Sequence, residues 1–379
     1  MASVDGVVLG DISAVELSKP AVKAHLGALT CEAHIVGVNI NMKAFLALFI
    51  SSLIFGFVAL PQDKRSVPAR APLLLVQDIP LPNVGGRIDH FTFDAKRKRV
   101  IGAALGNNTV EIVDTFSGRD IHSIAGAAAP QGVVYVEDID RLFVANGTDG
   151  KLRIYDGSSF KLLNTVDIGE DADNVRYYPT EKKVFVAYGG DDGGGIAVVD
   201  AATGKRLDDV AKLDAHPESF QISASKPVIY ANIATKAKLA LIDRPTHKVT
   251  DWPLKTGKSN YPMALDEADH RIFVVTRRPA LLVVLDSETG SMVASVPCVN
   301  DADDLYYDSG RKRIYVPGGE GLISVIQQTD ADHYGFLANV ATTVGARTGL
   351  WYEKRDRFYL AVPASSKQGA ALWVYAPED

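Results

Sequence analysis

A short apolar segment led by a basic residue recurs along most of this sequence, as in Arg141-Leu142-Phe143 and Arg313-Ile314-Tyr315. Successive copies lie 42 or 44 residues apart, counted at their first apolar positions: Val100, Leu142, Val184, Val228, Ile272, Ile314 and Phe358. In five copies a second apolar segment follows and ends in aspartate: Asp114, Asp156, Asp200, Asp243 and Asp286. Two series with nearly the same spacing indicate a structural repeat.

Each repeat predicts four short strands. A lead-in strand such as Phe91-Thr92-Phe93 precedes the basic-led strand, the aspartate-ended strand comes next, and a fourth strand completes the unit. Residues 200–204 suit a turn after the third strand, because aspartate bonds to its own backbone and glycine accepts a left-handed conformation. Four strands in roughly 40–50 residues are typical of a propeller blade, and no helical periodicity competes with this pattern.

Seven repeats fit the chain, but the last one ends after the strand that contains Trp373 and lacks a fourth strand. Residues 72–82 carry the missing pattern at the other end of the repeat region. We therefore predict an all-β fold over residues 72–379, a seven-bladed β-propeller with four-stranded blades. The N-terminal strand (residues 72–82) would complete the last blade and close the ring, which removes the exposed edges of an open array.

The N-terminal region predicts export. Residues 44–60 are apolar and uncharged and follow Lys43, so residues 42–62 form either a signal peptide or a retained membrane anchor, with residues 63–71 as a linker. We interpret residues 1–41 as a non-native or disordered extension, with translation starting at Met42. The expected location is the periplasm or the extracellular space, with membrane attachment only if residues 44–60 are retained.

Composition narrows the range of partners. The 379 residues include 47% hydrophobic residues and 40 Lys+Arg against 46 Asp+Glu, with a sequence pI near 5.8. These values exclude a wholly disordered chain, and the net charge of −6 excludes a general nucleic-acid binder, which needs a basic face. Cys298 is the single cysteine after the extension, so no internal disulfide is expected. We expect a monomer.

The aspartate-to-glycine turns carry a family resemblance. Together with the basic-led strands, residues 114–118, 200–204 and 286–290 resemble the turns of the YncE-like, YVTN-type seven-bladed propellers of bacterial exported proteins. The sixth repeat departs from this pattern at residues 327–330. The resemblance covers residues 72–379 and implies an exported propeller, but it specifies no reaction.

Polar residues occupy equivalent positions in the connections between successive blades. In a propeller these connections surround one mouth of the central channel, so their side chains are expected to converge there. The candidate ligand-binding residues are Asp89, His90, Gln131, Asp173, Asn174, His216, Glu218, Tyr261, Asp303, Asp304 and Arg347. The alternative interpretation is that the channel mouth is polar because it is filled with solvent, and that it binds no ligand.

Oxygen-bearing side chains dominate this set, which raises the alternative of a bound divalent cation. The candidate ligands for Ca²⁺ or Mg²⁺ are Asp89, Asp173, Glu218 and Asp303. Hard cations take carboxylate oxygens, and a bound metal would polarise a lactone or ester carbonyl. His90 and His216 are the candidate catalytic acid or base. The alternative is that these aspartates are present because aspartate commonly begins turns, and that no metal binds.

Basic and glycine-rich residues reach the same region. These basic residues either pair with the acids or form a clamp for an anionic ligand: Arg87, Arg277, Arg278 and Arg347. The glycine-rich residues 189–195 are interpreted as a surface loop.

The sequence favours an exported binding propeller that holds a protein, a glycan or a small-molecule ligand at the channel-mouth face. The alternative is a divalent-metal-dependent hydrolase, lactonase or lyase with its site at that mouth. No Gly-x-Ser-x-Gly, His-Glu-x-x-His or Cys-x-x-Cys-His motif supports a serine hydrolase, a zinc protease or a covalent haem site.

Overall fold

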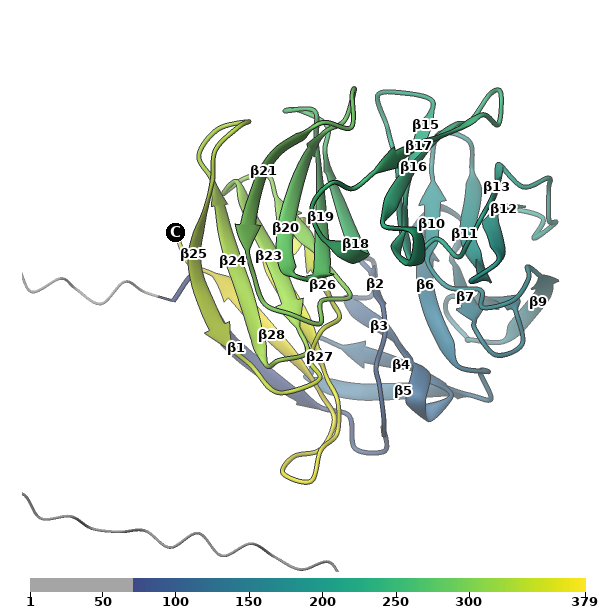
Figure 1. Cartoon of the computed structure of the whole chain (residues 1–379). Helices are drawn as coiled ribbons and strands as arrows, with labels where there is room; N and C mark the ends of the chain where they lie inside the picture. The colour runs from purple at the N-terminus through teal and green to yellow at the C-terminus, as the bar shows by residue number, and fades with distance from the viewer. Residues whose placement is uncertain (1–70) are drawn as a thin grey trace, which may run out of the picture. The chain divides into compact units, whose positions relative to one another are not determined.

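The computed structural model describes residues 71–379, which lie within one compact unit, Ser66–Asp379. Their strands form seven four-stranded sheets, and each sheet is one blade of a propeller (Figure 1). The predicted all-β, seven-bladed fold is confirmed. The predicted extension, signal peptide or anchor, and linker before residue 71 lie outside the described residues.

Blades 1 to 4 follow one another along the chain. Blade 1 contains β2 (Phe91–Asp94), β3 (Arg99–Ala104), β4 (Thr109–Asp114) and β5 (Arg119–Ala125). Blade 2 contains β6 (Pro130–Val136), β7 (Arg141–Asn146), β8 (Lys151–Asp156) and β9 (Leu162–Asp167). Blade 3 contains β10 (Val175–Tyr178), β11 (Lys183–Gly190), β12 (Gly193–Asp200) and β13 (Ala211–Leu213). Blade 4 contains β14 (Ser219–Ile222), β15 (Val228–Ile233), β16 (Lys238–Asp243) and β17 (Val249–Pro253).

Blades 5 to 7 complete the ring. Blade 5 contains β18 (Lys258–Asp266), β19 (Arg271–Arg278), β20 (Ala280–Asp286) and β21 (Met292–Pro297). Blade 6 contains β22 (Tyr306–Asp308), β23 (Arg313–Gly318), β24 (Leu322–Gln328) and β25 (Tyr334–Ala341). Blade 7 contains β26 (Gly349–Tyr352), β27 (Arg357–Val362), β28 (Ala371–Pro377) and β1 (Leu73–Pro80). The helical segments of residues 71–379 are short 3₁₀ turns, none of them long and apolar enough to cross a bilayer: η1 (Leu105–Asn107), η2 (Glu137–Ile139), η3 (Ala234–Lys236) and η4 (Glu353–Arg355).

The first strand of each blade lies innermost. β2, β6, β10, β14, β18, β22 and β26 contact one another in this order, and β26 contacts β2, so these strands surround a central channel. Successive side chains of a strand point to opposite faces of its sheet and so toward the two neighbouring blades. Apolar side chains fill the spaces between blades; Phe143 of blade 2 and Val184 of blade 3, for example, belong to one buried cluster.

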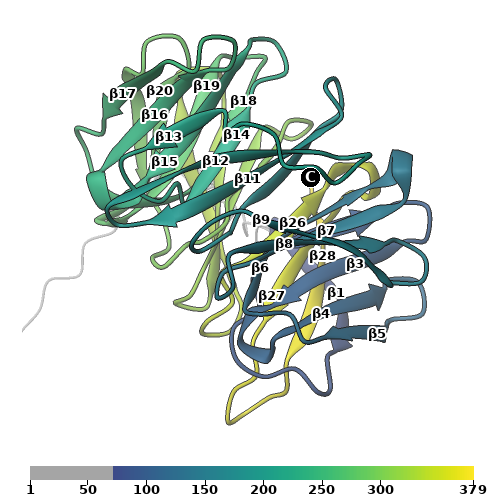
Figure 2. The same cartoon turned by 90° about the vertical axis from the view of Figure 1, so that its right-hand side faces the viewer.

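The outermost strand of blade 7 comes from the other end of the described chain. β1 pairs antiparallel with β28, with Leu73 opposite Pro377 and Ile79 opposite Leu372, and Figure 2 shows the two strands side by side. Ile79 is fully buried in a cluster that joins blades 7 and 1. The segment predicted at residues 72–82 thus supplies the fourth strand of this blade.

The aspartates of the repeat hold the turns after the third strands. Asp200 Oδ1 accepts a hydrogen bond from the N–H of Thr203 at 2.7 Å, and Gly204 has a φ of +68°. In the sixth repeat, where the sequence departs from the pattern, Asp330 Oδ1 takes this role and accepts from the N–H of Asp332 at 2.9 Å. The blade geometry therefore survives the loss of the motif.

Candidate functional site

One mouth of the channel contains a cavity of about 350 Å³. The predicted residues that line it are His90, Gln131, Asp173, His216, Glu218, Tyr261, Asp303 and Arg347. Asn174 and Asp304 line a second cavity, of about 300 Å³, between the innermost strands. Asp89 lines neither cavity and is fully buried. The structure therefore brings most of the predicted set to one site but splits it between two chambers.

Asp173, His216 and Glu218 converge on one side of the mouth cavity. Asp173 lies in the connection to β10, whereas His216 and Glu218 lie in the connection to β14, so two neighbouring blades supply the group. Each residue places a ligand atom within 4.8 Å of the others, and His216 Nε2 is 3.6 Å from Asp173 Oδ2. The group has the residue types and the spacing of a metal site.

The glycine-rich hairpin between β11 and β12 orients His216. The Gly189 carbonyl oxygen lies 3.0 Å from His216 Nδ1, and the Gly190 carbonyl accepts the backbone N–H of His216 at 2.8 Å. Because a carbonyl only accepts, Nδ1 carries a proton and Nε2 faces Asp173. Gly189 has a φ of +134°, and a Cβ there would lie 2.3 Å from Gly194 Cα, so only glycine fits. The prediction of a surface loop over residues 189–195 is wrong, because Gly189 and Gly190 end β11 and residues 193–195 begin β12; it also missed this positioning role.

Burial and neighbouring charges shift the titration of this group. Burial raises the pKa of Glu218 to about 7, although His216 opposes the rise. Burial lowers the pKa of His216, but Asp173 outweighs this effect and raises the pKa to about 9. Burial also acts to raise the pKa of Asp173, yet His216 and His90 outweigh it and lower the pKa. The Glu218 carboxylate makes no hydrogen bond or ion pair within residues 71–379.

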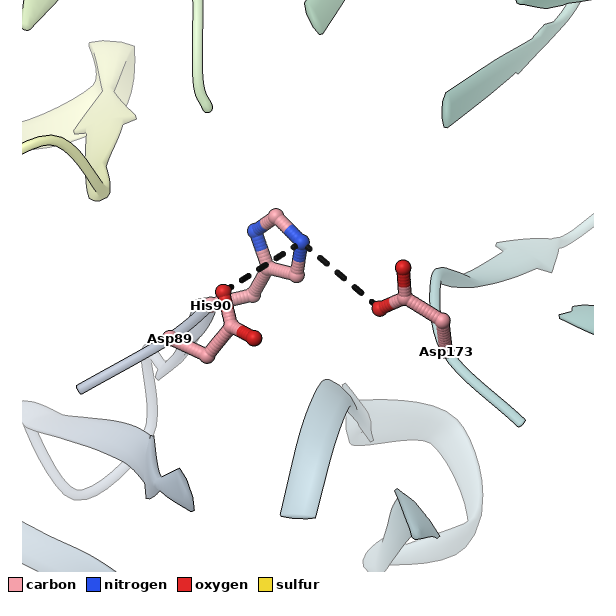
Figure 3. Close-up of side chains that lie close together, drawn as sticks. All are labelled: Asp89, His90 and Asp173. Atoms are coloured by element: carbon pink, nitrogen blue, oxygen red, sulfur yellow. Dashed lines mark ion pairs between the residues drawn. The ribbon is translucent and has the colours of Figure 1, made fainter. Parts of the chain in front are cut away.

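The imidazole of His90 lies among three carboxylates. Figure 3 shows it between Asp89 and Asp173, whose Oδ1 atoms are 3.8 and 3.9 Å from its Nε2. Nδ1 lies 3.2 Å from Asp304 Oδ1, and Nε2 lies 3.2 Å from the amide nitrogen of Asn174. Burial lowers the pKa of His90, but Asp304 and Asp89 outweigh it and raise the pKa to about 10. Both ring nitrogens have close polar neighbours, so neither offers a free lone pair.

Asp89 is a buried partner of Arg87. Its two carboxylate oxygens each accept from Arg87 Nη2 at 3.1 Å. Burial raises the pKa of Asp89 to about 7, against the opposing effects of His90 and Arg87. A molecule in the mouth cavity does not reach this carboxylate.

Three guanidinium groups converge on Asp303. Arg87 Nη2 lies 3.1 Å and Arg347 Nε lies 2.9 Å from Asp303 Oδ2, and Arg277 Nη2 donates to Oδ1. Arg347 Nη1 also contacts Asp301 Oδ1 at 2.8 Å. These contacts match the ion-pair alternative for the arginines. They also leave Asp303, a predicted metal ligand, without a free oxygen.

The second cavity begins beneath His90, which lines both chambers. The backbone N–H of Gly349 donates to Asp304 Oδ2 at 2.8 Å, and the Tyr306 hydroxyl donates to the Gly349 carbonyl at 2.5 Å. Burial acts to raise the pKa of Asp304, but His90 outweighs it, so the pKa is lowered. Asp304 therefore supports His90 from below and lies outside the mouth.

Two further residues at the mouth escaped the sequence analysis. Asp171 lines the cavity and accepts a hydrogen bond from Gln131 Nε2 at 2.6 Å. Thr235 lines it from η3, in the loop between the second and third strands of blade 4. Both lie in loops that face this mouth, but aligning one position per repeat does not select them.

Comparison with known proteins supports the fold alone. No protein-family profile and no curated protein matches the sequence. Among solved structures, the chain resembles a hydrazine synthase chain of Kuenenia stuttgartiensis with a TM-score of 0.66 and 14% sequence identity, over 75% of this chain and 94% of that one. At this identity the likeness shows a shared propeller fold and carries no activity across.

Proposed function

We propose that this chain is an exported, YncE-like propeller that binds a small polar molecule in the mouth cavity. The cavity carries the proposal, because its volume of about 350 Å³ is that of a small-ligand pocket and charged side chains from several blades line it. A protein partner buries roughly 800 Å² on each side and does not need such a hollow. We therefore favour a small molecule, or a single sugar unit of a glycan, over a protein.

The two sides of the cavity differ in chemistry. Asp173 and Glu218 present carboxylate oxygens on one side. On the other side the Arg277 guanidinium lies 3.8 Å from the centre of the Tyr261 ring and is already paired with an acid. Groups that donate hydrogen bonds, or that carry a cation, suit the first side, and the second side acts as a flat wall.

Export and family membership are part of the same proposal. Their support is the resemblance of the repeat turns to the YncE-like proteins and the apolar residues 44–60 after Lys43. The expected location is the periplasm or the extracellular space, with membrane attachment only if residues 44–60 are retained. Cell fractionation and mass spectrometry of the mature N-terminus test this, and a cytoplasmic protein would contradict it.

A melting-temperature screen tests binding. The purified chain is mixed with hydroxy acids, amino acids, monosaccharides and lactones, and a ligand at a hundredfold excess over its Kd should stabilise the fold by about 2.7 kcal/mol. Thr235 is exposed at the cavity, so Thr235→Trp should fill the entrance and abolish the shift. Thr148 lies in the corresponding loop of blade 2 and does not line the cavity, so Thr148→Trp is the control. A shift that survives Thr235→Trp, or no stabilising compound, would contradict the proposal.

A metal-dependent hydrolase or lactonase is the second candidate function. The observation that favours it is the imidazole of His216 grouped with two carboxylates at an open cavity, where a metal would polarise an ester carbonyl. The same lactones, assayed for hydrolysis with and without added metal, distinguish an enzyme from a binding protein. Turnover that is lost in His216→Asn would favour the enzyme.

A further inference from the structure

Two carboxylates at the mouth have oxygens without hydrogen-bond partners. Asp173 is only 8% exposed, its Oδ1 has no hydrogen-bond partner, and the nearby His90 Nε2 is 3.9 Å away. A buried carboxylate oxygen in this state is costly unless a cation or a water satisfies it. The Glu218 carboxylate, on the same side of the cavity, also has no hydrogen bond or ion pair with residues 71–379. His90 and His216 lie at ion-pair distance from Asp173, but no hydrogen bond satisfies its Oδ1, which leaves room for a directly bound cation.

His216 has the orientation of a metal ligand. Its Nδ1 donates to the Gly189 carbonyl at 3.0 Å, so Nε2 is the nitrogen that would bind a metal, in exchange for its proton. That nitrogen faces Asp173 Oδ2 at 3.6 Å, which is ion-pair distance and leaves space for an ion between the two atoms after a small movement. Histidines that bind metals usually donate their other N–H to a carbonyl or carboxylate, which fixes the ring.

We propose that Asp173, His216 and Glu218 bind one divalent transition-metal ion of the Zn²⁺ or Mn²⁺ type. Their ligand atoms lie within 4.8 Å of one another. Tetrahedral ligands with bonds of roughly 2.1 Å are about 3.4 Å apart, so small side-chain rotations close the group around an ion.

The imidazole determines the type of ion. Ca²⁺ and Mg²⁺ prefer oxygen ligands alone, whereas a histidine with two carboxylates suits Zn²⁺ or Mn²⁺. Two neighbouring residues are not available as further ligands of this ion. His90 Nε2 faces the Asn174 amide nitrogen at 3.2 Å, and both oxygens of Asp303 accept hydrogen bonds from arginines. Asp89, which is paired with Arg87, also stays outside the site.

The metal site deepens the proposed function, and its role rests on that function. Three protein ligands leave at least one coordination position, and the group faces the mouth cavity. An oxygen of the bound molecule would fill that position. The class of molecule narrows to compounds that chelate a metal through a carboxylate and an adjacent hydroxyl group, as α-hydroxy acids do.

Metal titration of the untagged chain, after treatment with a chelator, tests the site. We expect one equivalent of Zn²⁺ or Mn²⁺ per chain, bound at least tenfold more tightly than Ca²⁺ or Mg²⁺. Glu218→Gln should weaken this binding at least 100-fold, and it should fold normally because burial already opposes the charge of Glu218. Asp167→Asn is the control, because its carboxylate is 89% exposed and lines neither cavity. Its metal binding should equal that of the wild type.

Electron-spin-echo spectroscopy of bound Mn²⁺ gives a second readout that needs no variant. Coupling to an imidazole ¹⁴N nucleus supports the proposal, and its absence overturns it. Unchanged metal binding in Glu218→Gln, or preferential binding of Ca²⁺, also overturns it.

The compound screen separates this proposal from the proposed function. Compounds that stabilise the chain while no metal binds would refute the metal site and leave the mouth cavity as a ligand site. Metal binding without any stabilising compound would support the metal site and refute the proposed function. Stronger stabilisation by hydroxy acids in the presence of metal would support both.

Discussion

Replacing Asp303 by asparagine should destabilise the propeller and create an anion site that the wild type lacks. Both oxygens of Asp303 accept from guanidinium groups, those of Arg87, Arg277 and Arg347. Asparagine keeps the volume and one acceptor but removes the negative charge. The three guanidinium groups are then left with too few counter-charges, and they repel one another.

The magnitude follows from the contacts and their exposure. A hydrogen bond between charged groups contributes about 1.5–3 kcal/mol. Asp303 is 9% exposed, but the arginine side chains are 19–39% exposed, so solvent screens part of each contact. We therefore expect a total loss of about 2–4 kcal/mol. A folded unit of roughly 300 residues unfolds with an entropy near 0.6 kcal/mol/K, so the melting temperature should fall by about 3–7 °C.

The assay measures the melting temperature at low salt, and then in chloride and in sulfate solutions of equal ionic strength. In Asp303→Asn, sulfate should restore at least half of the lost stability, because a divalent oxyanion can accept from several guanidinium groups at once. Chloride should restore less. Asp167→Asn is the control: its carboxylate is 89% exposed and lies 3.5 Å from Lys151, so its removal should change stability by less than about 0.5 kcal/mol.

Two results would refute this reasoning. An unchanged melting temperature in Asp303→Asn would mean that the arginines do not depend on this carboxylate. A sulfate effect of equal size in the wild type would mean that the arginines are free to hold an anion. The second result would favour an anion clamp over the ion-pair network.

The remaining predictions concern the last blade and a carboxyl pair. Ile79→Ala should cost about 2–4 kcal/mol in urea unfolding, because Ile79 on β1 is fully buried, whereas the half-exposed Leu75 on the same strand should tolerate alanine. If Ile79→Ala leaves the free energy of unfolding unchanged, the packing of β1 against blade 7 is contradicted. Burial, aided by Glu111, raises the pKa of Asp120 in the folded state to about 7, so stability should fall as the pH rises from about 4 to about 7. Between pH 5 and pH 8 the free energy of unfolding should fall by about 1–2 kcal/mol for a half-buried group, and Asp120→Asn should remove this fall. Urea unfolding curves at the two pH values measure it, and an equal fall in the variant would contradict the prediction.

The fold could be predicted because each blade reuses the same backbone interactions. The aspartate that ends a third strand accepts backbone N–H groups in the turn, as Asp200 does, so it recurs wherever that turn recurs. The sixth blade shows the limit of a motif: its turn is held by Asp330, which lies later than the pattern expects. Strand geometry tolerates such a shift, so counting repeats succeeded where the motif failed.

The sequence predicted where the site lies but not which side chains form it. Aligned positions placed Asp173 and Glu218 at the mouth because the repeat determines where each connection lies. It does not determine which side chains meet across blades. Asp303 illustrates this, since its partners come from blades 1, 5 and 7 and make it an ion-pair acceptor instead of a metal ligand. The role of Gly189 depends on a backbone carbonyl, which no residue type reveals.

The two halves of the channel mouth differ in how their carboxylates are paired, although both are rich in acids. Around Asp303 each carboxylate oxygen has a guanidinium partner, and that half contributes stability. Around Asp173 the buried Oδ1 lacks a hydrogen-bond partner, His216 directs Nε2 at Oδ2 of the same carboxylate, and burial opposes the charge of Glu218. A buried oxygen without a hydrogen bond costs folding free energy, and proteins tolerate such a cost mainly where a ligand offsets it. The absence of partners, more than the number of acids, marks the binding half of the mouth.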